Sequence, residues 1–458
     1  MKKALTLLAL ALLGVEATTA QSVNTPRCGH DIIRESYFAN HPDARASYEA
    51  AREASFAAMA DEPQAKTTAN GPIPVVFHVV LTASQLNTIG GTAGVMERAD
   101  SSIAVLNRDY NRRNGDSTLI PAVFKPLYSN MDIQFGLARR NEQGQATTGV
   151  EIYTIPSSAG ITAFSANPDA NAHGSGFACS DAKYSTTQGG NGLSAWDQSK
   201  YLNIWICNIN NPNGVLGIAI SPNTSTLFGV PAAERGVVLN YGAFGKRRLA
   251  TQYFISGIDQ GRTLTHEIGH FFELEHIWGT SAAGTCADDD GINDTPPQFD
   301  ENYNCPTGVI PNCTNSPGGE MYMNYMDYLD DACLVMFTNG QGVRMRQQLQ
   351  FGGPSYGLTQ NPTLTVPLDI DDVAAAIKLN LAPNPARGFA TLSFDPKAGI
   401  GRAVLVDALG RSLRIFNSTS RSAGTISLDL SGVPAGLYTV RVETADGVAI
   451  SQKLLVQP

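Results

Sequence analysis

The sequence has few charged residues and no excess of basic ones. Asp, Glu, Lys and Arg make up 16% of the 458 residues, against about 25% in an average soluble domain. The 41 acidic residues outnumber the 32 basic ones, and the formal net charge is −9. A nucleic-acid-binding protein that works through a basic surface needs the opposite balance, so we expect no nucleic-acid partner. General disorder is excluded as well, because 43% of the residues are apolar and can form a core.

Long apolar runs are almost absent. The one candidate follows two lysines and covers Ala4–Val15, with the small residues Thr18 and Ala20 at positions −3 and −1 of a cleavage site. About 12 apolar residues are too few for a membrane span, which needs roughly 20. The pattern predicts a secretory signal peptide over residues 1–20, an exported chain and no transmembrane segment. Disulfide bonds are compatible with that compartment.

Shifts in composition divide the rest of the chain into four parts. Residues 21–72 are polar and Ala-rich, with one helix expected over 43–60. Residues 73–351 alternate buried strands with amphipathic helices and are expected to form one domain. Gly-Pro, Asn-Pro and Val-Pro steps mark residues 352–378 as a linker. Residues 379–458 lack Cys and His and contain short alternating strands between turns, which predicts a small all-β sandwich.

The periodicity of apolar residues predicts the main elements of both domains. In the first, strands are expected over residues 73–81, 131–137, 201–209, 216–220 and 237–241, and helices over 95–110, 262–272 and 341–351. In the second, strands are expected over 390–394, 403–407, 412–416, 425–430, 437–443 and 449–456.

Three of the seven histidines lie within eleven residues. His266 and His270 are four apart and therefore share one face of the expected 262–272 helix. Two imidazoles at this spacing can bind one Zn²⁺, and His276, past the end of the helix, can approach as a third ligand. Glu267 follows the first histidine and can take a proton from a zinc-bound water, whose pKa falls towards about 7. A His-Glu-x-x-His pair alone also occurs by chance, and the third histidine makes chance a poor explanation.

A second motif lies about 50 residues after His276, past a segment rich in turn-forming residues. Residues 323–328 read Met-Asn-Tyr-Met-Asp-Tyr. A methionine and two tyrosines alone are more often core residues than site residues. Together with the three histidines they are similar to the Met-turn that passes beneath the zinc ion in metzincins.

The chain resembles the pappalysin family of metzincin metallopeptidases over roughly residues 73–350. The resemblance rests on IPVVFHVV at 73–80, YLNIW at 201–205, the histidine motif with HIWG at 276–279, DTP at 294–296 and NYMDY at 324–328, extended by Phe337-Thr338, Gln341 and Arg344-Met345. It implies an α+β metzincin-like zincin catalytic domain, with a mixed twisted sheet and backing and active-site helices, followed by the small all-β Ig-like sandwich.

The resemblance also implies roles for the matching residues. His266, His270 and His276 would bind zinc, Glu267 would be the general base and acid, Met326 would lie beneath the site, and Tyr328 would help to stabilise the tetrahedral intermediate. Residues 216–220 would be the edge strand that pairs with substrate. The implied disulfides are Cys286–Cys313 and Cys305–Cys333, although four cysteines alone allow three connectivities.

One residue departs from the family pattern. Glu273 stands where the family usually has Gly, at the end of the helix, where a positive φ is favoured. A non-glycine residue in that conformation costs about 1–2 kcal/mol. A rival hypothesis takes Glu301 as the third metal ligand, as in gluzincins, and the Met-turn motif argues against it.

The remaining cysteines have different surroundings. Cys28, in Arg27-Cys28-Gly29, resembles the cysteine switch of latent metalloproteases, because a thiolate can bind zinc in place of the catalytic water. We therefore interpret residues 21–72 as a propeptide; a free or mispaired thiol is the alternative. Cys179 and Cys207 either form a third bridge or are buried as free thiols.

Two groups of acidic and polar residues have alternative explanations. Asp290, Asn293 and Thr295 could bind a structural Ca²⁺, as the family resemblance implies, or belong to a solvated acidic loop. Asp330 and Asp331 follow the Met-turn, where metzincins have the wall of the S1′ pocket. They could select Arg or Lys after the scissile bond, as the family resemblance implies for Arg, or face solvent or calcium.

Residues 379–458 resemble the C-terminal sorting domain of the type IX secretion system of Bacteroidetes. The matching segments are LAPNPA at 381–386, DALGR at 407–411, AGLY at 435–438 and KLLV at 453–456. The resemblance implies the type IX secretion machinery as a partner and a location outside a Gram-negative cell, secreted or attached to its surface. A generic carbohydrate- or protein-binding sandwich is the alternative.

The motifs together predict a secreted zinc-dependent endopeptidase, made as a latent zymogen, that hydrolyses peptide bonds of proteins. The alternative is a secreted binding or adhesion protein with a degenerate zinc site, which only Glu273 favours. A zinc hydrolase of a non-peptide substrate would need a closed pocket rather than a cleft bordered by an edge strand.

Overall fold

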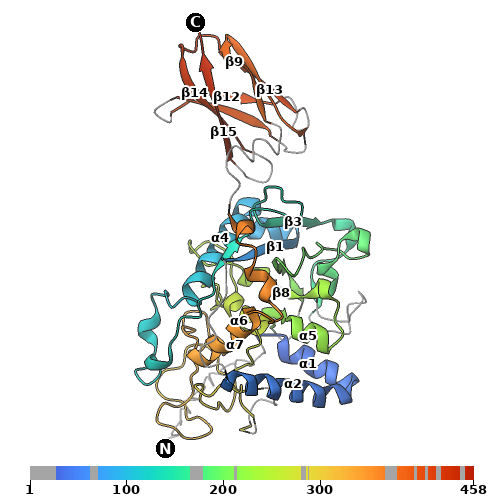
Figure 1. Cartoon of the computed structure of the whole chain (residues 1–458), viewed down its shortest axis with the longest axis vertical. Coiled ribbons are helices and arrows are strands. Elements are labelled where there is room, and N and C mark those ends of the chain that lie inside the picture. The colour runs from blue at the N-terminus through green and yellow to red at the C-terminus, as the bar shows by residue number, and fades with distance from the viewer. Residues whose placement is uncertain are drawn as a thin grey trace, which may run out of the picture.

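A six-stranded mixed sheet lies at the centre of the first unit in the computed structural model of the protein (Figure 1). Its strands are β1 (Ile73–Thr82), β2 (Phe135–Leu137), β3 (Val150–Ile155), β5 (Leu202–Cys207), β7 (Gly217–Ile220) and β8 (Gly236–Asn240). Their order is β2-β1-β5-β8-β7, and β3 also pairs with β1. The pairings are parallel except for that of β7 with β8, which makes β7 an antiparallel strand at one end of this order.

The sequence of β1 explains its central place in the sheet. Nine of its ten residues are buried, as expected for an apolar strand of a parallel sheet that is covered on both faces. It pairs with β5 on one side and with β2 and then β3 on the other. Its buried His78 is satisfied by Glu151, 2.9 Å from Nδ1, and by Asn203, 2.8 Å from Nε2.

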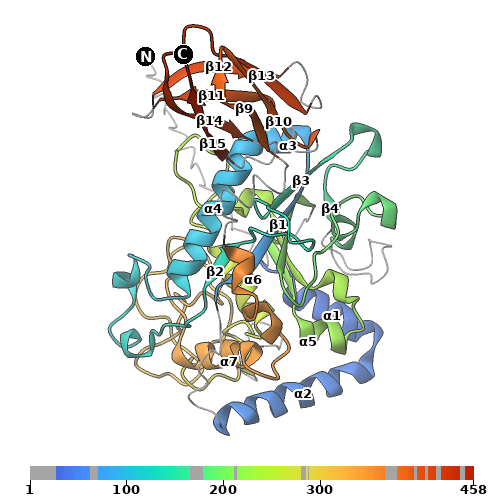
Figure 2. The ribbon, with the colours of Figure 1, turned by 45° about the horizontal axis from the view of Figure 1, so that its top comes forward.

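Helices pack on the sheet and carry the histidine motif. They are α3 (Ala83–Thr88), α4 (Gly91–Asp109), α5 (Pro222–Leu227), α6 (Arg262–Phe271) and α7 (Asn339–Leu349). The long helix α4, light blue in Figure 2, lies near β1 and β2. It buries Val95 and Leu106 in the main core, where they join Leu264 and Ile268 of α6. The core thereby fixes α6 against the sheet.

Two further helices precede the sheet in the chain. α1 (His30–Asn40) and α2 (Pro42–Asp61) lie near α5 and α7 (Figure 1). α2 agrees with the expected helix over 43–60, whereas α1 was not expected. α1 buries Ile33 and Phe38 in a cluster with Ile218 of β7 and Val238 of β8. The N-terminal segment is therefore packed against the edge of the sheet.

Seven strands form the C-terminal unit. They are β9 (Asn380–Arg387), β10 (Phe389–Ser393), β11 (Arg402–Val406), β12 (Ser412–Asn417), β13 (Thr425–Asp429), β14 (Gly436–Glu443) and β15 (Ala449–Val456), in the order β12-β11-β14-β15-β9-β10-β13. They share a core of their own, with Leu392, Leu405 and Leu428 fully buried. The all-β character matches the prediction, six of the strands were expected, and β9 was not. The Ig-like arrangement stays a prediction.

Several expected elements differ in extent. The strand expected over 131–137 is reduced to β2, and the one expected over 201–209 is divided into β5 and β6 (Ile209–Asn210), which pairs with β4 (Phe164–Ser165). Short 3-10 helices occupy Tyr356–Thr359 and Pro362–Thr365, within the expected linker, and Leu358 there is buried in the main core.

The structure describes residues 27–61, 71–165, 179–210, 214–279, 285–286, 288–366, 379–396, 400–407, 411–418, 424–443 and 449–458. The predicted signal peptide lies outside these residues, as do parts of the predicted propeptide and linker. Within the described ranges, the helices lack the combination of length and apolarity that crossing a bilayer requires. The limits of the domains therefore stay predictions from the sequence.

Candidate metal centre and active site

Three histidines converge at the end of helix α6. All ten residues of this helix are buried. His266 and His270 lie one turn apart, and their Nε2 atoms are 3.1 Å from each other. The Nε2 atom of His276 is also 3.1 Å from that of His270. The three Nε2 atoms, two from the helix and one from the chain that follows it, therefore face the same point.

The chain reaches His276 through a tight reversal after the helix. Glu273 has φ 70°, in the left-handed region that the family pattern predicts for this position. Its backbone carbonyl accepts a hydrogen bond from Arg344 Nε at 3.2 Å. The strain of a non-glycine residue is therefore present here, and the reversal still brings His276 beside His270.

The opposite nitrogen of each histidine is already bonded. Nδ1 of His266 lies 2.7 Å from the Tyr325 carbonyl, and Nδ1 of His270 lies 2.7 Å from the Leu274 carbonyl. Nδ1 of His276 lies 2.6 Å from Asp31 Oδ2. These acceptors place the proton of each neutral ring on Nδ1 and leave the lone pair on Nε2, where a metal would be bound. Burial lowers the pKa of His266 to about 3, which favours the same neutral form.

Three lone pairs facing one another at this distance fit a cation between them. Three imidazoles, with a fourth position open or taken by a thiol, form a donor set typical of Zn²⁺. The Sγ atom of Cys28 and the three histidine nitrogens all lie within 4.8 Å of one another. The residues present therefore fit a zinc ion.

Glu267 lies between the histidines and the edge strand. A side chain at Gly217 of β7 would collide with the Glu267 side chain, since an added Cβ would be 2.5 Å from its Cγ. Glu267 Oε2 accepts from the Cys28 thiol at 3.5 Å, and burial raises the pKa of Glu267 to about 8. The absence of a side chain at Gly217 lets the strand backbone run directly past this carboxyl group.

The predicted Met-turn lies under the helix. A Cβ atom at Gly269 would be 2.5 Å from Met326 Sδ, so this glycine allows the methionine to approach α6. Tyr328 is buried, with its ring 5.0 Å from that of His276. Its hydroxyl donates a hydrogen bond to the Cys28 carbonyl at 3.4 Å. The turn therefore packs against the helix that carries the first two histidines, and it places the phenol ring of Tyr328 beside His276.

The segment around Cys28 pairs with the end of the edge strand. The amide of Leu216 donates to the Arg27 carbonyl at 2.7 Å, and the amide of Gly29 donates to the Gly217 carbonyl at 2.9 Å. Cys28 and Gly217 form a parallel bridge. The edge strand is therefore already paired, and the thiol lies over the histidines.

The two aspartates after the Met-turn have different roles. Asp330 Oδ1 binds Arg27 Nη2 at 2.7 Å. Asp331 is buried and accepts three backbone N–H groups at the start of α6, from Gln260, Gly261 and Arg262, at 2.7 to 3.2 Å. Of the two, Asp330 is the one whose carboxylate binds Arg27, which lines a pocket together with His266 and Glu267.

The cysteines follow the implied pairing. The structure contains the disulfides Cys286–Cys313 and Cys305–Cys333. Cys179 and Cys207 are free and fully buried, in the cluster that also holds Ile33 of α1. Of the two alternatives left open by the sequence, the structure has free thiols.

The predicted calcium residues lie together in one loop, with different exposure. Asp290 is buried, and its Oδ1 accepts from the Ile292 amide and the Thr295 hydroxyl. Its Oδ2 is buried with no hydrogen-bond partner in the part of the chain that the structure describes. Asn293 is exposed. An unsatisfied carboxylate oxygen fits a hard cation, although Asn293 does not share its buried position.

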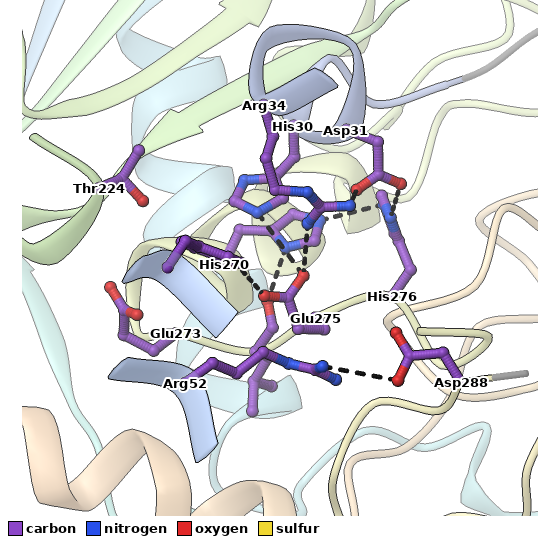
Figure 3. Close-up of polar contacts among 12 residues, drawn as sticks. His30, Asp31, Arg34, Arg52, Thr224, His270, Glu273, Glu275, His276 and Asp288 are labelled. Atoms are coloured by element: carbon purple, nitrogen blue, oxygen red, sulfur yellow. Dashed lines mark hydrogen bonds and ion pairs between the residues drawn. The ribbon is translucent and has the colours of Figure 1, made fainter. Parts of the chain in front are cut away.

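Four residues of the site were not predicted from the sequence. They are His30, Asp31 and Arg34 of α1 and Glu275 of the unit that holds the histidines, which form a polar cluster beside the histidines that is buried except for the half-buried Asp31 (Figure 3). The acidic Glu275 stands next to His276 in the sequence, but its partners lie about 240 residues away. Only the motif Arg27-Cys28-Gly29, which directly precedes α1, pointed to this part of the chain.

Comparisons with known proteins agree with this geometry. Residues 192–350 match the sequence model of a family described as Pregnancy-associated plasma protein-A, and residues 380–457 match that of a secretion system C-terminal sorting domain. A structure of Tannerella forsythia mature mirolysin in complex with a cleaved peptide is 34% identical, with a TM-score of 0.55 over 66% of this chain and 100% of that chain. A structure of a T. forsythia promirolysin mutant is 32% identical, with a TM-score of 0.60 over 75% of this chain and 100% of that chain.

Curated relatives match a shorter part of the chain. An extracellular metalloprotease of Arthroderma otae is 43% identical over 94 residues, which are 20% of this chain and 33% of the relative. The chain spans about a third of the length of the first curated relatives that it matches.

These findings define the class: the mixed sheet with its helices is the fold of a metallopeptidase. The chain belongs to the pappalysin family of metallopeptidases, which confirms the resemblance seen in the sequence. The match over residues 380–457 likewise confirms that the C-terminal unit resembles a sorting domain.

Proposed function

We propose that the protein is a secreted, zinc-dependent endopeptidase made as a latent zymogen. The observation that carries the proposal is the convergence of three Nε2 atoms, 3.1 Å apart in two pairs, beside the carboxyl group of Glu267. Family membership supports the reaction class. The intact donor set argues against a binding protein with a degenerate site.

Each residue of the site would have a separate role in peptide hydrolysis. His266, His270 and His276 would hold a zinc ion, which when bound supplies Lewis acidity and lowers the pKa of a water molecule. Glu267 would take the proton of the attacking water on a carboxylate oxygen and later give it to the leaving amine. Tyr328 Oη, which now donates to the Cys28 carbonyl, would donate instead to the carbonyl oxygen of the substrate. Residues 216–220 would pair with the substrate backbone.

Latency would follow from the position of Cys28. Its thiol lies within 4.8 Å of the three ligand nitrogens and contacts Glu267, so it takes the place that water would need. The surrounding backbone also takes up hydrogen bonds of the edge strand. A larger share of the chain is covered by the promirolysin structure than by the mature one, 75% against 66%, which supports a proenzyme.

Specificity for a basic residue after the scissile bond would come from Asp330. Its carboxylate binds the Arg27 guanidinium, and the Leu329 carbonyl accepts from the same group at 2.7 Å. We take Arg27 as the stand-in for a substrate Arg or Lys side chain. Asp331 would serve α6 instead, because its carboxylate is already used by three amides.

Two further features complete the proposal. Asp290 and Thr295 would hold a structural Ca²⁺ with Asn293 at the rim, and the Oδ2 atom of Asp290, which has no hydrogen-bond partner among the described residues, supports this. The C-terminal unit would direct the chain through the type IX secretion machinery of a Gram-negative cell, so that the enzyme meets protein substrates outside it.

A cleavage assay with a metal measurement tests the function. The full chain is activated and offered a peptide library, zinc is measured per chain, and Glu267→Ala is the control. We expect one zinc per chain in both proteins and cleavage only by the wild type. One bound zinc without cleavage in any activated wild-type preparation would favour the binding-protein alternative.

A further inference from the structure

Two consecutive residues of α1 contact two of the three histidines. The ring of His30 stacks on that of His270, with centroids 4.3 Å apart and an interplanar angle of 5°. The next residue, Asp31, accepts the Nδ1 hydrogen of His276 at 2.6 Å. The proposed propeptide therefore contacts the histidines in two ways. Cys28 lies near their metal-facing nitrogens, and His30 and Asp31 of α1 contact the rings of His270 and His276.

The carboxylate of Asp31 is held in one orientation. Its other oxygen binds Arg34 Nη2 at 2.5 Å, and Arg34 Nη1 binds Glu275 Oε2 at 2.9 Å. Tyr48 of α2 donates to the second oxygen of Glu275 at 2.5 Å. Figure 3 shows Arg34 between the two carboxylates, with His276 on the far side of Asp31. The Arg34 and Glu275 side chains are only 3% and 8% exposed, so solvent screens their ion pair little, whereas the Asp31 side chain is 29% exposed.

The three histidines differ in where their outer partners come from. His266 and His270 donate to the carbonyls of Tyr325 and Leu274, which belong to the catalytic unit. His276 donates to a carboxylate of α1. A carboxylate in this place fixes the ring and raises the basicity of the ligand, and loss of such a partner typically costs 10–100-fold in metal affinity.

We propose that Asp31 is a positioning residue for the third zinc ligand, and that the propeptide strengthens zinc binding at the site that it blocks. The inference rests on the proposed zinc site. Loss of the propeptide would remove the carboxylate partner of His276 together with Cys28, so the latent form binds zinc more tightly than the mature form.

Zinc affinity measured on the full chain tests this inference. All proteins carry Glu267→Ala, so that none can cleave itself, and the zinc dissociation constant is obtained by competition with a chromophoric chelator. Asp31→Asn removes the negative charge, Asp31→Glu keeps it, and Asp43→Asn is the matched control at an exposed aspartate of α2. We expect Asp31→Asn to weaken zinc binding 10–100-fold, Asp31→Glu to recover most of the loss, and Asp43→Asn to have no effect.

Two measurements separate positioning from a loss of structure. Because Asp31→Asn also removes an ion-pair partner of the buried Arg34, the metal-free protein should lose some stability, so the measured quantity is the rise in melting temperature on adding zinc, which should be smaller in Asp31→Asn than in the wild type. In Co²⁺-loaded samples the thiolate charge-transfer band should persist in Asp31→Asn, while the d–d bands shift. Loss of the thiolate band, or the same zinc-dependent rise in melting temperature in the wild type and in Asp31→Asn, would mean that Asp31 only docks the propeptide and would overturn the inference.

The failures of the two proposals are distinguishable. If the wild type binds no zinc, the proposed function is wrong. If the wild type binds zinc and Asp31→Asn binds it within twofold as tightly, the zinc site stands and the role of Asp31 is wrong.

Discussion

Two adjacent residues of the proposed propeptide contact different parts of the site. Cys28 lies over the three histidines, and Arg27 binds Asp330 in the region proposed to hold the residue after the scissile bond. The position of Cys28 would affect metal binding, and the contact of Arg27 with Asp330 would affect substrate specificity. Substitutions at the two places should therefore have separable effects.

Replacement of the thiol should shorten latency. In Cys28→Ala the fourth position near the histidines is open to water, so we expect self-activation to be faster by on the order of tenfold, equivalent to about 1.4 kcal/mol. The rate of self-activation is measured by following the appearance of the mature species over time on a gel. Cys179→Ala, at a buried free cysteine in another cluster, is the control. Latency unchanged in Cys28→Ala would contradict the switch.

Replacement of Asp330 should change substrate preference. Without the carboxylate, Asp330→Asn loses a charge-assisted bond to a basic side chain, which at this half-buried position is worth about 1.5–3 kcal/mol. We expect kcat/KM for peptides with Arg after the scissile bond to fall about tenfold to a hundredfold. Matched peptides with Leu there should be cleaved as before. An equal fall for both peptides would place the determinant elsewhere.

Residue spacing revealed the histidines but not their supporting partners. Four-residue spacing on a helix is enough to place His266 and His270 on one face. Asp31 and Arg34 are separated from His276 and Glu275 by more than 240 residues. Nothing local in the sequence pairs them, because only the folded sheet brings α1 to this edge.

Among the elements, α6 depends on contacts at both of its ends. The amides of its first residue and of the two residues before it donate to Asp331, and the chain after its last turn leads into the left-handed Glu273. The start and the end of the helix together fix where its two histidines lie.

The amide contacts of Asp331 should contribute to stability. Asp331→Ala leaves buried N–H groups without an acceptor, and we expect the free energy of unfolding to fall by about 1–3 kcal/mol. Chemical denaturation of the full chain measures this free energy. Asp330→Ala, which breaks a partly exposed ion pair, should cost less than about 1 kcal/mol. Equal effects of the two substitutions would contradict the division of roles between these aspartates.

The strain at Glu273 should appear as a difference between two substitutions. Glu273→Ala and Glu273→Gly both remove the side chain near Arg344, but only glycine adopts φ 70° without a steric cost. We expect Glu273→Gly to be more stable than Glu273→Ala by about 1 kcal/mol. The melting temperatures of the two variants, measured under the same conditions, test this difference in stability. A more stable alanine variant would show that the turn carries no strain.

Two elements escaped prediction for physical reasons. α1 has five apolar residues among its eleven, in a segment that reads as polar overall, and Ile33 and Phe38 are buried because β7 and β8 offer a surface for them. β9 contains Pro383 and Pro385, which in the sequence indicate turns rather than a strand. By contrast, β1 and α6 have strong periodicity of their own and were predicted nearly to the residue.

At the scale of the whole molecule, the buried residues form separate cores. Main-core residues such as Leu264 belong to the unit with the histidines, and residues such as Leu405 belong to the C-terminal unit. The change in composition after residue 378 anticipated this division. It could not show that Leu358 of the expected linker packs in the first core.

Metal removal should therefore affect one unit. We expect calorimetry of the full chain to show two transitions, and a zinc chelator to lower the first unit's melting temperature by several degrees, since a ligand at 1,000 times its Kd contributes about 4 kcal/mol. The transition of the C-terminal unit should stay in place. Added Zn²⁺ should restore the original curve. A chelator that shifts both transitions, or neither, would contradict the assignment of the metal to the histidine cluster.

The two disulfides overlap along the chain. Cys305 lies inside the loop closed by Cys286–Cys313, and Cys313 lies inside the loop closed by Cys305–Cys333. A single backbone cut anywhere between Cys286 and Cys333 therefore leaves the two pieces covalently joined. Met326 and Tyr328 lie within this interval. A nicked enzyme would thus keep its Met-turn attached to its histidine helix, which suits a protease exposed to other proteases and to its own copies.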